Sequence, residues 1–80
     1  MGMFGPALRK LRLKAGLTQE EVGAAAGVSR EYVSMLETGK NSPTIEVFIR
    51  LCHAVGVYPA DVITQLDHTA RSKPTKAPRR

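Results

Sequence analysis

The chain has 80 residues, which is enough for one small domain, and we expect no separate catalytic or effector domain. Hydrophobic residues make up 42% and charged residues 24%, a composition that allows folding around a modest core. The net charge of +5 points to an anionic partner, yet residues 1–66 (seven Lys/Arg, six Asp/Glu) contribute only +1, while residues 67–80 (five and one) contribute +4. Charge alone therefore does not identify the folded part as a nucleic-acid binder.

Cys52 is the only cysteine, which excludes an intrachain disulfide and fits a reducing compartment. No apolar run approaches the roughly 18 residues of a membrane span. Charges between Arg9 and Lys14 interrupt the first apolar residues, so the pattern of a signal peptide is missing. We therefore expect a cytoplasmic protein without membrane contact.

Glycines and prolines divide the chain into segments with helical spacing and no alternating strand pattern, which predicts an all-α, compact five-helix bundle. The first predicted helix runs from about Pro6 to Ala15. Pro6 suits a first helical turn, Leu8 and Leu11 form an apolar stripe, and Gly16 ends the helix.

The second predicted helix runs from about Gln19 to Ala25, after a capping box in which Thr18 and Glu21 satisfy each other's backbone amides. Its expected apolar contacts are Val22, Ala25 and Ala26. Gly23 and the small alanines allow a neighbouring helix to approach closely.

The third predicted helix, from about Arg30 to Glu37, follows Ser29 as N-cap and ends at Gly39. Val33 and Leu36 are its inner face. The residues between the second and third helices, Ala26-Gly27-Val28, form a tight turn.

A fourth helix is predicted from about Ile45 to Val55 with Thr44 as its cap, and a fifth from about Pro59 to Leu66. The expected apolar stripe of the fourth helix consists of Ile45, Phe48, Leu51, Cys52 and Val55.

From residue 67 the apolar content falls, so we divide the chain into a folded domain, 1–66, and a basic, disordered tail, 67–80. The five cations of this tail either bind DNA phosphate nonspecifically or remain solvated.

Two short helices joined by a turn that contains glycine make a helix-turn-helix, whose second helix can enter the DNA major groove. The residues that carry this pattern are Leu17-Thr18-Gln19-Glu20-Glu21-Val22, Ala26-Gly27-Val28-Ser29, Val33, Leu36-Glu37-Thr38-Gly39-Lys40 and Pro43. In these residues the sequence resembles the XRE family of helix-turn-helix regulators, which includes phage repressor and Cro proteins. The resemblance covers roughly residues 6–66, and it supplies the docking geometry.

The resemblance implies a DNA-reading face on the third helix and phosphate contacts around it. The base-reading positions are Ser29, Arg30, Glu31, Ser34 and Met35. The phosphate-binding positions are Gln19, Tyr32, Thr38, Lys40 and Asn41. Arg30 can donate twice to guanine, whereas Glu31 places an acid in an anionic groove, which costs affinity unless the acid meets the N4 amino group of cytosine.

The resemblance also implies a salt bridge between Arg12 and Glu37, the alternative being two exposed charges that never meet. It further implies a two-fold dimer through the fifth helix and the loop before it. The apolar residues expected in this interface are Val57, Tyr58, Val62, Ile63 and Leu66. Tyr58 replaces the usual small cap before that helix.

Adjacent residues on a helix point about 100° apart, so Cys52 and His53 do not converge on a metal or a substrate, and we place Cys52 inside and His53 outside. Glu20, Glu21 and Glu46 are interpreted as cap and surface residues rather than an acid–base pair. We expect no enzyme activity, no metal, no cofactor and no small-molecule ligand.

The sequence therefore predicts a homodimeric transcriptional regulator of the repressor or controller type. It would bind double-stranded DNA and read an inverted-repeat operator through the third helix. The alternative is a protein-interaction module of the same fold, an antitoxin-like partner or an adaptor, without sequence-specific DNA contact.

Overall fold

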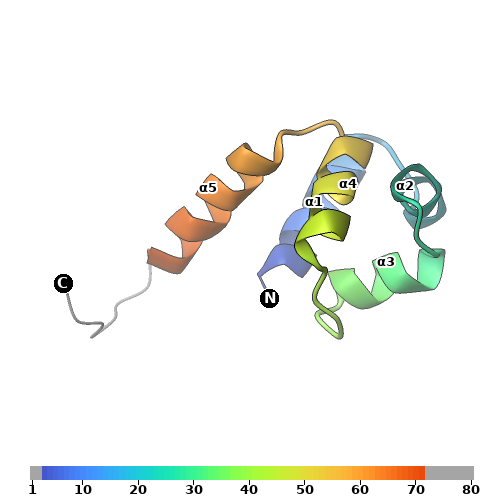
Figure 1. Ribbon diagram of the computed structural model, residues 1–80, viewed down its shortest axis with the longest axis horizontal. Helices are drawn as coiled ribbons and strands as arrows, with labels where there is room; N and C mark the ends of the chain where they lie inside the picture. Colours follow the sequence, from blue (N-terminus) through green and yellow to red (C-terminus); the bar gives the residue numbers. More distant parts are fainter. Residues whose placement is uncertain (1–2, 72–80) are drawn as a thin grey trace.

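The computed structural model describes residues 3–71, which form five α-helices and, within that range, no strand. The helices are α1 (Phe4–Lys14), α2 (Gln19–Ala26), α3 (Arg30–Glu37), α4 (Ile45–Ala54) and α5 (Pro59–Arg71) (Figure 1). Helix α2 packs against both α3 and α4, α1 packs against α3, and α4 packs against α5. The all-α, five-helix prediction is confirmed.

Three hydroxyl side chains set the starts of the middle helices. Thr18, Ser29 and Thr44 each accept a hydrogen bond from the backbone amide three residues on, at 3.0, 3.0 and 3.2 Å. These bonds satisfy amides that have no partner inside the helix. At Thr18 the capping box is complete, because its backbone amide donates to Glu21 Oε1 at 2.8 Å. The three predicted caps are confirmed.

An aromatic pair in the core joins α1 to α4. The rings of Phe4 and Phe48 meet edge to face, with centroids 5.0 Å apart, and both side chains are buried. Helix α1 begins at Phe4 rather than at Pro6, because burying this ring against α4 extends the helix toward the N-terminus. The remaining buried apolar residues are Leu8, Val22, Ala26, Val33, Leu36, Leu51, Cys52, Val55, Val62 and Leu66.

Two residues that were expected in the core, Ile45 and Ala25, are exposed instead. Ile45 is 69% exposed, and Ile49, one turn later on the same face of α4, is 38% exposed. The buried stripe of α4 runs through Phe48, Leu51 and Cys52, so Ile45 lies outside it. Ala25 is also exposed, because Val22, Gly23 and Ala26 form the buried face of α2.

The end of α5 also differs from the prediction. The helix continues past Leu66 as far as Arg71, through residues that were assigned to the tail. Arg71 Nε donates to both carboxylate oxygens of Asp67, at 3.0 and 2.9 Å, an i,i+4 pair that supports a helix without apolar burial. The rest of the predicted tail, residues 72–80, lies outside the described residues.

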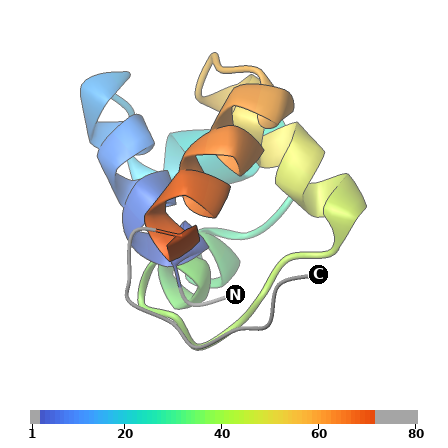
Figure 2. The same cartoon turned by 90° about the vertical axis from the view of Figure 1, so that its left-hand side faces the viewer.

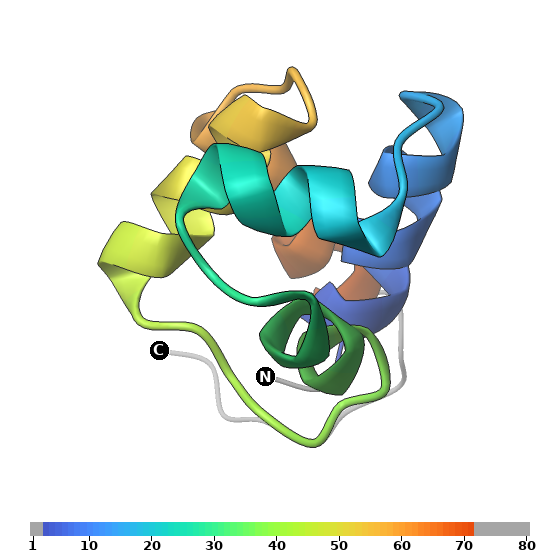
Figure 3. The same cartoon turned by 90° about the vertical axis from the view of Figure 1, so that its right-hand side faces the viewer.

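Helix α5 and helix α3 lie on different sides of the molecule. Seen from one side, α5 lies in front, and seen from the opposite side, α2 and α3 lie in front of it (Figures 2 and 3). Within residues 3–71, no single helix has the length and apolar composition needed to cross a membrane; α4 and α5 meet that test only together, across a bend of 108°.

Candidate nucleic-acid interface

A tight turn sets α3 across α2. Gly27 has φ +77°, a left-handed conformation that favours glycine, and the Val28 amide donates to the Gly23 carbonyl at 2.9 Å. A Cβ atom on Gly23 would lie 2.6 Å from the Val28 carbonyl oxygen, so the turn also needs glycine at that position. Figure 3 shows the result: α2 lies across the view while α3 is seen nearly end-on.

The outer face of α3 carries the predicted base-reading residues. Ser29, Arg30, Glu31 and Met35 are exposed and Ser34 is half-buried, whereas Val33 and Leu36 fill the core from the opposite face. Ser29 uses its hydroxyl oxygen as the cap of α3, so this side chain is already oriented by the helix. The face is therefore polar, exposed and anchored from behind by buried apolar contacts.

Arg30 and Glu31 lie close to each other on this face. Arg30 Nη2 and Glu31 Oε2 are 3.8 Å apart, and the two side chains are 55% and 75% exposed. A pair this exposed contributes little to stability, because water screens it. The Arg30 guanidinium and the Glu31 carboxylate can therefore exchange this weak ion pair for other hydrogen-bond partners.

Of the predicted phosphate-binding residues, three follow α3 and one, Tyr32, lies within it. Thr38, Lys40 and Asn41 are exposed in the segment after α3; the Thr38 hydroxyl donates to the Ser34 carbonyl at 3.0 Å, and Asn41 Nδ2 lies 3.9 Å from the Met35 sulfur. Tyr32 is half-buried and packs against the core.

Gln19 is the first residue of α2 and is half-buried, and its side chain is hydrogen-bonded to a residue of α3. Gln19 Nε2 donates to Glu37 Oε1 at 3.0 Å. Gln19 and Arg30 also line the same open depression, of about 570 Å³, between the end of α1 and the starts of α2 and α3. The structure thus brings one candidate phosphate ligand and one candidate base reader onto a common surface.

The ion pair between Arg12 and Glu37 is present and buried. Arg12 Nε lies 2.7 Å from Glu37 Oε2, and Arg12 Nη2 donates to Glu37 Oε1 at 3.1 Å. The side chains are 10% and 3% exposed. The hydrogen bond to Glu37 raises the pKa of Arg12, although burial opposes this shift. Arg12 Nη1 also donates to the Leu17 carbonyl at 3.0 Å, so the guanidinium joins α1, the loop before α2 and α3.

Sequence reasoning missed a second arginine near the turn. Arg50 Nε donates to the Ala26 carbonyl, the last of α2, at 2.9 Å, and Arg50 Nη1 pairs with Glu46 at 3.3 Å. A cation at a helix C-terminus satisfies a carbonyl that has no partner within the helix. The i,i+4 spacing of Glu46 and Arg50 was visible in the sequence, but the contact with α2 depends on the tertiary structure.

The apolar residues expected at a dimer interface divide into two groups. Tyr58 and Ile63 are 75% and 44% exposed, which leaves them available to a partner. Val62 and Leu66 are buried in the core of their own chain, and Val57 packs against it, so these three offer less surface to a partner, and their role in an interface stays a prediction. The periodicity shows that these positions are apolar but cannot say which surface covers them.

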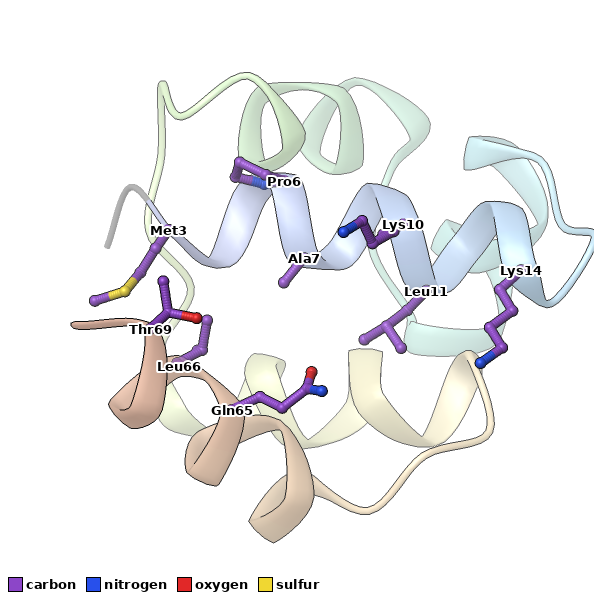
Figure 4. A pocket seen from close by; sticks show the side chains of 9 residues that line it. All are labelled: Met3, Pro6, Ala7, Lys10, Leu11, Lys14, Gln65, Leu66 and Thr69. Atoms are coloured by element: carbon purple, nitrogen blue, oxygen red, sulfur yellow. The ribbon is translucent and has the colours of Figure 1, made fainter. Parts of the chain in front are cut away.

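A groove of about 490 Å³ separates α1 from α5. Figure 4 shows Ala7 and Leu11 of α1 and Leu66 of α5 pointing into it, with Met3 at one end and Lys14 at the other. Ile63, a large apolar residue of α5 that is 44% exposed, is not among the residues that line this groove. This part of the molecule therefore leaves apolar surface uncovered.

Cys52 is buried and His53 is exposed, as predicted. Burial raises the pKa of the Cys52 thiol to about 11, so it is an unreactive core residue at neutral pH. Among residues 3–71, no three His, Cys, Asp or Glu side chains gather as a metal site would require.

Comparison with known proteins shows where this architecture recurs. A family model described as helix-turn-helix matches residues 8–62. The HTH-type transcriptional regulator y4dJ of Sinorhizobium fredii is 40% identical over 67 residues, which cover 84% of this chain and 87% of that protein.

Two solved structures are also similar. The restriction-modification controller protein C.AhdI of Aeromonas hydrophila has a TM-score of 0.73 at 31% identity, covering 76% of this chain and 88% of that one. The clp gene regulator ClgR of C. glutamicum has a TM-score of 0.77 at 35% identity, covering 85% and 88%.

Proposed function

The chain belongs to the helix-turn-helix family of DNA-binding transcriptional regulators, and from this premise we propose that it acts as a homodimer that reads an inverted-repeat operator through α3. The observation that carries the proposal is the exposed polar face of α3, held outward by the glycine turn and by buried Val33 and Leu36. The major groove is wide enough to admit such a helix.

The side chains on this face supply distinct base preferences. Arg30 presents two donors to the O6 and N7 acceptors of guanine, and Glu31 accepts from the N4 amino group of cytosine. Met35, 38% exposed, offers an apolar contact that suits the methyl group of thymine. In a guanine–cytosine pair, Arg30 and Glu31 separate and each finds a partner on the DNA.

Phosphate contacts would fix α3 in the groove from both ends. Gln19 lies at the start of α2, the helix end that favours an anion, and Thr38, Lys40 and Asn41 lie in the segment after α3. These contacts carry no sequence information but set the register of α3.

The dimer would form through Tyr58, Ile63 and the groove between α1 and α5. Within the described residues, α5 packs mainly against α4, and less closely than the other paired helices pack against each other, so much of its surface is left to a partner. In a two-fold dimer the same surface of each subunit meets its counterpart, and the two α3 helices reach half-sites about 34 Å apart. Such a dimer would work in the cytoplasm as a repressor or a controller, without a cofactor.

Selection of bound duplexes from a random-sequence pool tests the proposal. The expected product is a two-fold symmetric sequence whose half-sites are one turn of DNA apart. A pool that shows no enrichment would favour the alternative, a protein-interaction module of the same fold.

A further inference from the structure

The carboxylate of Glu37 accepts hydrogen bonds from side chains in two other parts of the chain. Its Oε2 atom accepts from Arg12 Nε at 2.7 Å, and its Oε1 atom accepts from Arg12 Nη2 at 3.1 Å and from Gln19 Nε2 at 3.0 Å. The Glu37 side chain is 3% exposed, while Gln19 is half-buried at the edge of the depression that Arg30 also lines. The buried Glu37 carboxylate is therefore hydrogen-bonded to the Gln19 amide, which lies at the protein surface.

This contact fixes the orientation of the Gln19 amide. An ionised carboxylate can only accept hydrogen bonds, so the nitrogen of the amide, and not its oxygen, must face Glu37. One N–H of Gln19 is used in that bond, and the second remains free to donate. Without Glu37, the amide could turn over and present its oxygen to an anion, which would repel it.

From this geometry we propose that Glu37 is a positioning residue for DNA binding, which presents the free N–H of Gln19 to a backbone phosphate. The inference rests on the proposed function, because it requires Gln19 to meet DNA. Arg12 makes the arrangement compatible with an anionic ligand, since its guanidinium neutralises the buried carboxylate. Ordering the long Gln19 side chain before binding also reduces the conformational entropy lost on binding.

A double-mutant cycle separates positioning from general stability. Glu37→Gln keeps the size of the side chain but can present either an oxygen or an amide to Gln19, so it no longer fixes the orientation. Binding to a duplex recovered from the random pool is measured for Gln19→Ala, Glu37→Gln and the double variant, at a temperature at which circular dichroism shows every variant folded. Lys40→Ala is the matched control, because Lys40 is an exposed candidate phosphate ligand, and the side-chain donors to Glu37 within residues 3–71 are Arg12 and Gln19.

In the unaltered chain, Gln19→Ala is expected to weaken binding roughly fivefold or more, the typical effect of losing a charge-assisted hydrogen bond. In the Glu37→Gln background the same change should cost less than about twofold, while Lys40→Ala costs the same factor in both backgrounds. The inference would be overturned if Gln19→Ala weakened binding by the same factor in both backgrounds. It would also be overturned if the Glu37→Gln background reduced the effect of Lys40→Ala as much as it reduced that of Gln19→Ala. If the unaltered chain bound no DNA, the proposed function and this inference would fall together.

A second measurement needs no variant and applies even if Glu37→Gln does not fold. The chain has two glutamines, Gln19 and Gln65, so their side-chain amide signals are easily assigned by NMR. Gln65 is exposed on α5 and is the reference. The Gln19 amide should be more ordered and should exchange its protons more slowly than that of Gln65 in the free protein. Equal order and exchange for the two amides would refute the positioning role.

Discussion

Arg12 Nε lies 2.7 Å from Glu37 Oε2, and at least nine-tenths of each side chain is buried. The pair joins α1 to the last turn of α3, and α3 is the helix that carries the proposed DNA-reading face. Helix α1 also approaches this turn closely at Gly5, where a Cβ atom would lie 2.4 Å from the Leu36 carbonyl oxygen. The position of the reading helix therefore depends on contacts outside the helix-turn-helix unit.

Removing Arg12 should destabilise the protein strongly. Arg12→Ala leaves the Glu37 carboxylate buried without its counter-ion, which typically costs about 3–5 kcal/mol of unfolding free energy. Chemical denaturation followed by circular dichroism measures this change. Arg71→Ala, which breaks an exposed ion pair, is the control and should change the unfolding free energy by less than about 0.5 kcal/mol. Similar small effects of both variants would contradict the structural role of the buried pair.

Gly23→Ala should destabilise the turn despite the higher helix propensity of alanine. The gain in propensity is roughly 1 kcal/mol, but the new Cβ would lie 2.6 Å from the Val28 carbonyl oxygen, which is backbone and cannot move cheaply. We expect a net loss of about 1–3 kcal/mol, measured by thermal unfolding, together with weaker DNA binding. Gly16→Ala has open space around it and tests backbone strain alone. A more stable Gly23→Ala variant would show that the turn has room for a Cβ atom at this position.

The Cys52 thiol should make stability depend on pH in the alkaline range. Burial raises its pKa from 9.0 to about 11, so between these values the unfolded chain loses a proton that the folded chain retains. Stability from this group is therefore complete below pH 9 and falls as the pH rises toward 11, by about 2 kcal/mol. Denaturation at pH 8 and pH 10.5, for the unaltered chain and Cys52→Ala, isolates this contribution. An identical pH dependence of both proteins would refute it.

Acidic residues on the exposed part of the proposed interface should separate the subunits without unfolding them. Tyr58→Asp with Ile63→Asp places charges where a partner would pack, and sedimentation should change from dimer to monomer with little change in melting temperature. Leu13→Asp is the control, because Leu13 is 54% exposed but does not line the groove between α1 and α5. A dimer that survives the double change would place the interface elsewhere.

Local signals predicted most of the fold. Side-chain caps and left-handed glycines act within a few residues, so Thr18, Ser29 and Gly27 could be assigned from the sequence alone. The start of α1 at Phe4 could not, because it depends on a ring contact with α4. The extension of α5 to Arg71 was also missed, since an i,i+4 ion pair rather than apolar spacing supports that turn.

The candidate site was only partly predictable. The resemblance to known regulators pointed to Arg12 and Glu37, but not to the bond from Gln19, which joins residues that lie 18 apart in the sequence. Apolar periodicity could not separate Leu66, which fills the core, from Ile63, which remains exposed. Both residues satisfy the same helical pattern, and only the packing of α5 on α4 distinguishes them.

The most direct test of the central claim is the base preference of an Arg30 variant. Duplexes are selected from a random pool with the unaltered chain, Arg30→Ala and Lys40→Ala. We expect Arg30→Ala to lose its preference at one base pair in each half-site, a loss of about 1–3 kcal/mol, while Lys40→Ala keeps the same sequence with lower affinity. An unchanged selected sequence for Arg30→Ala would contradict the claim that α3 reads DNA through this residue.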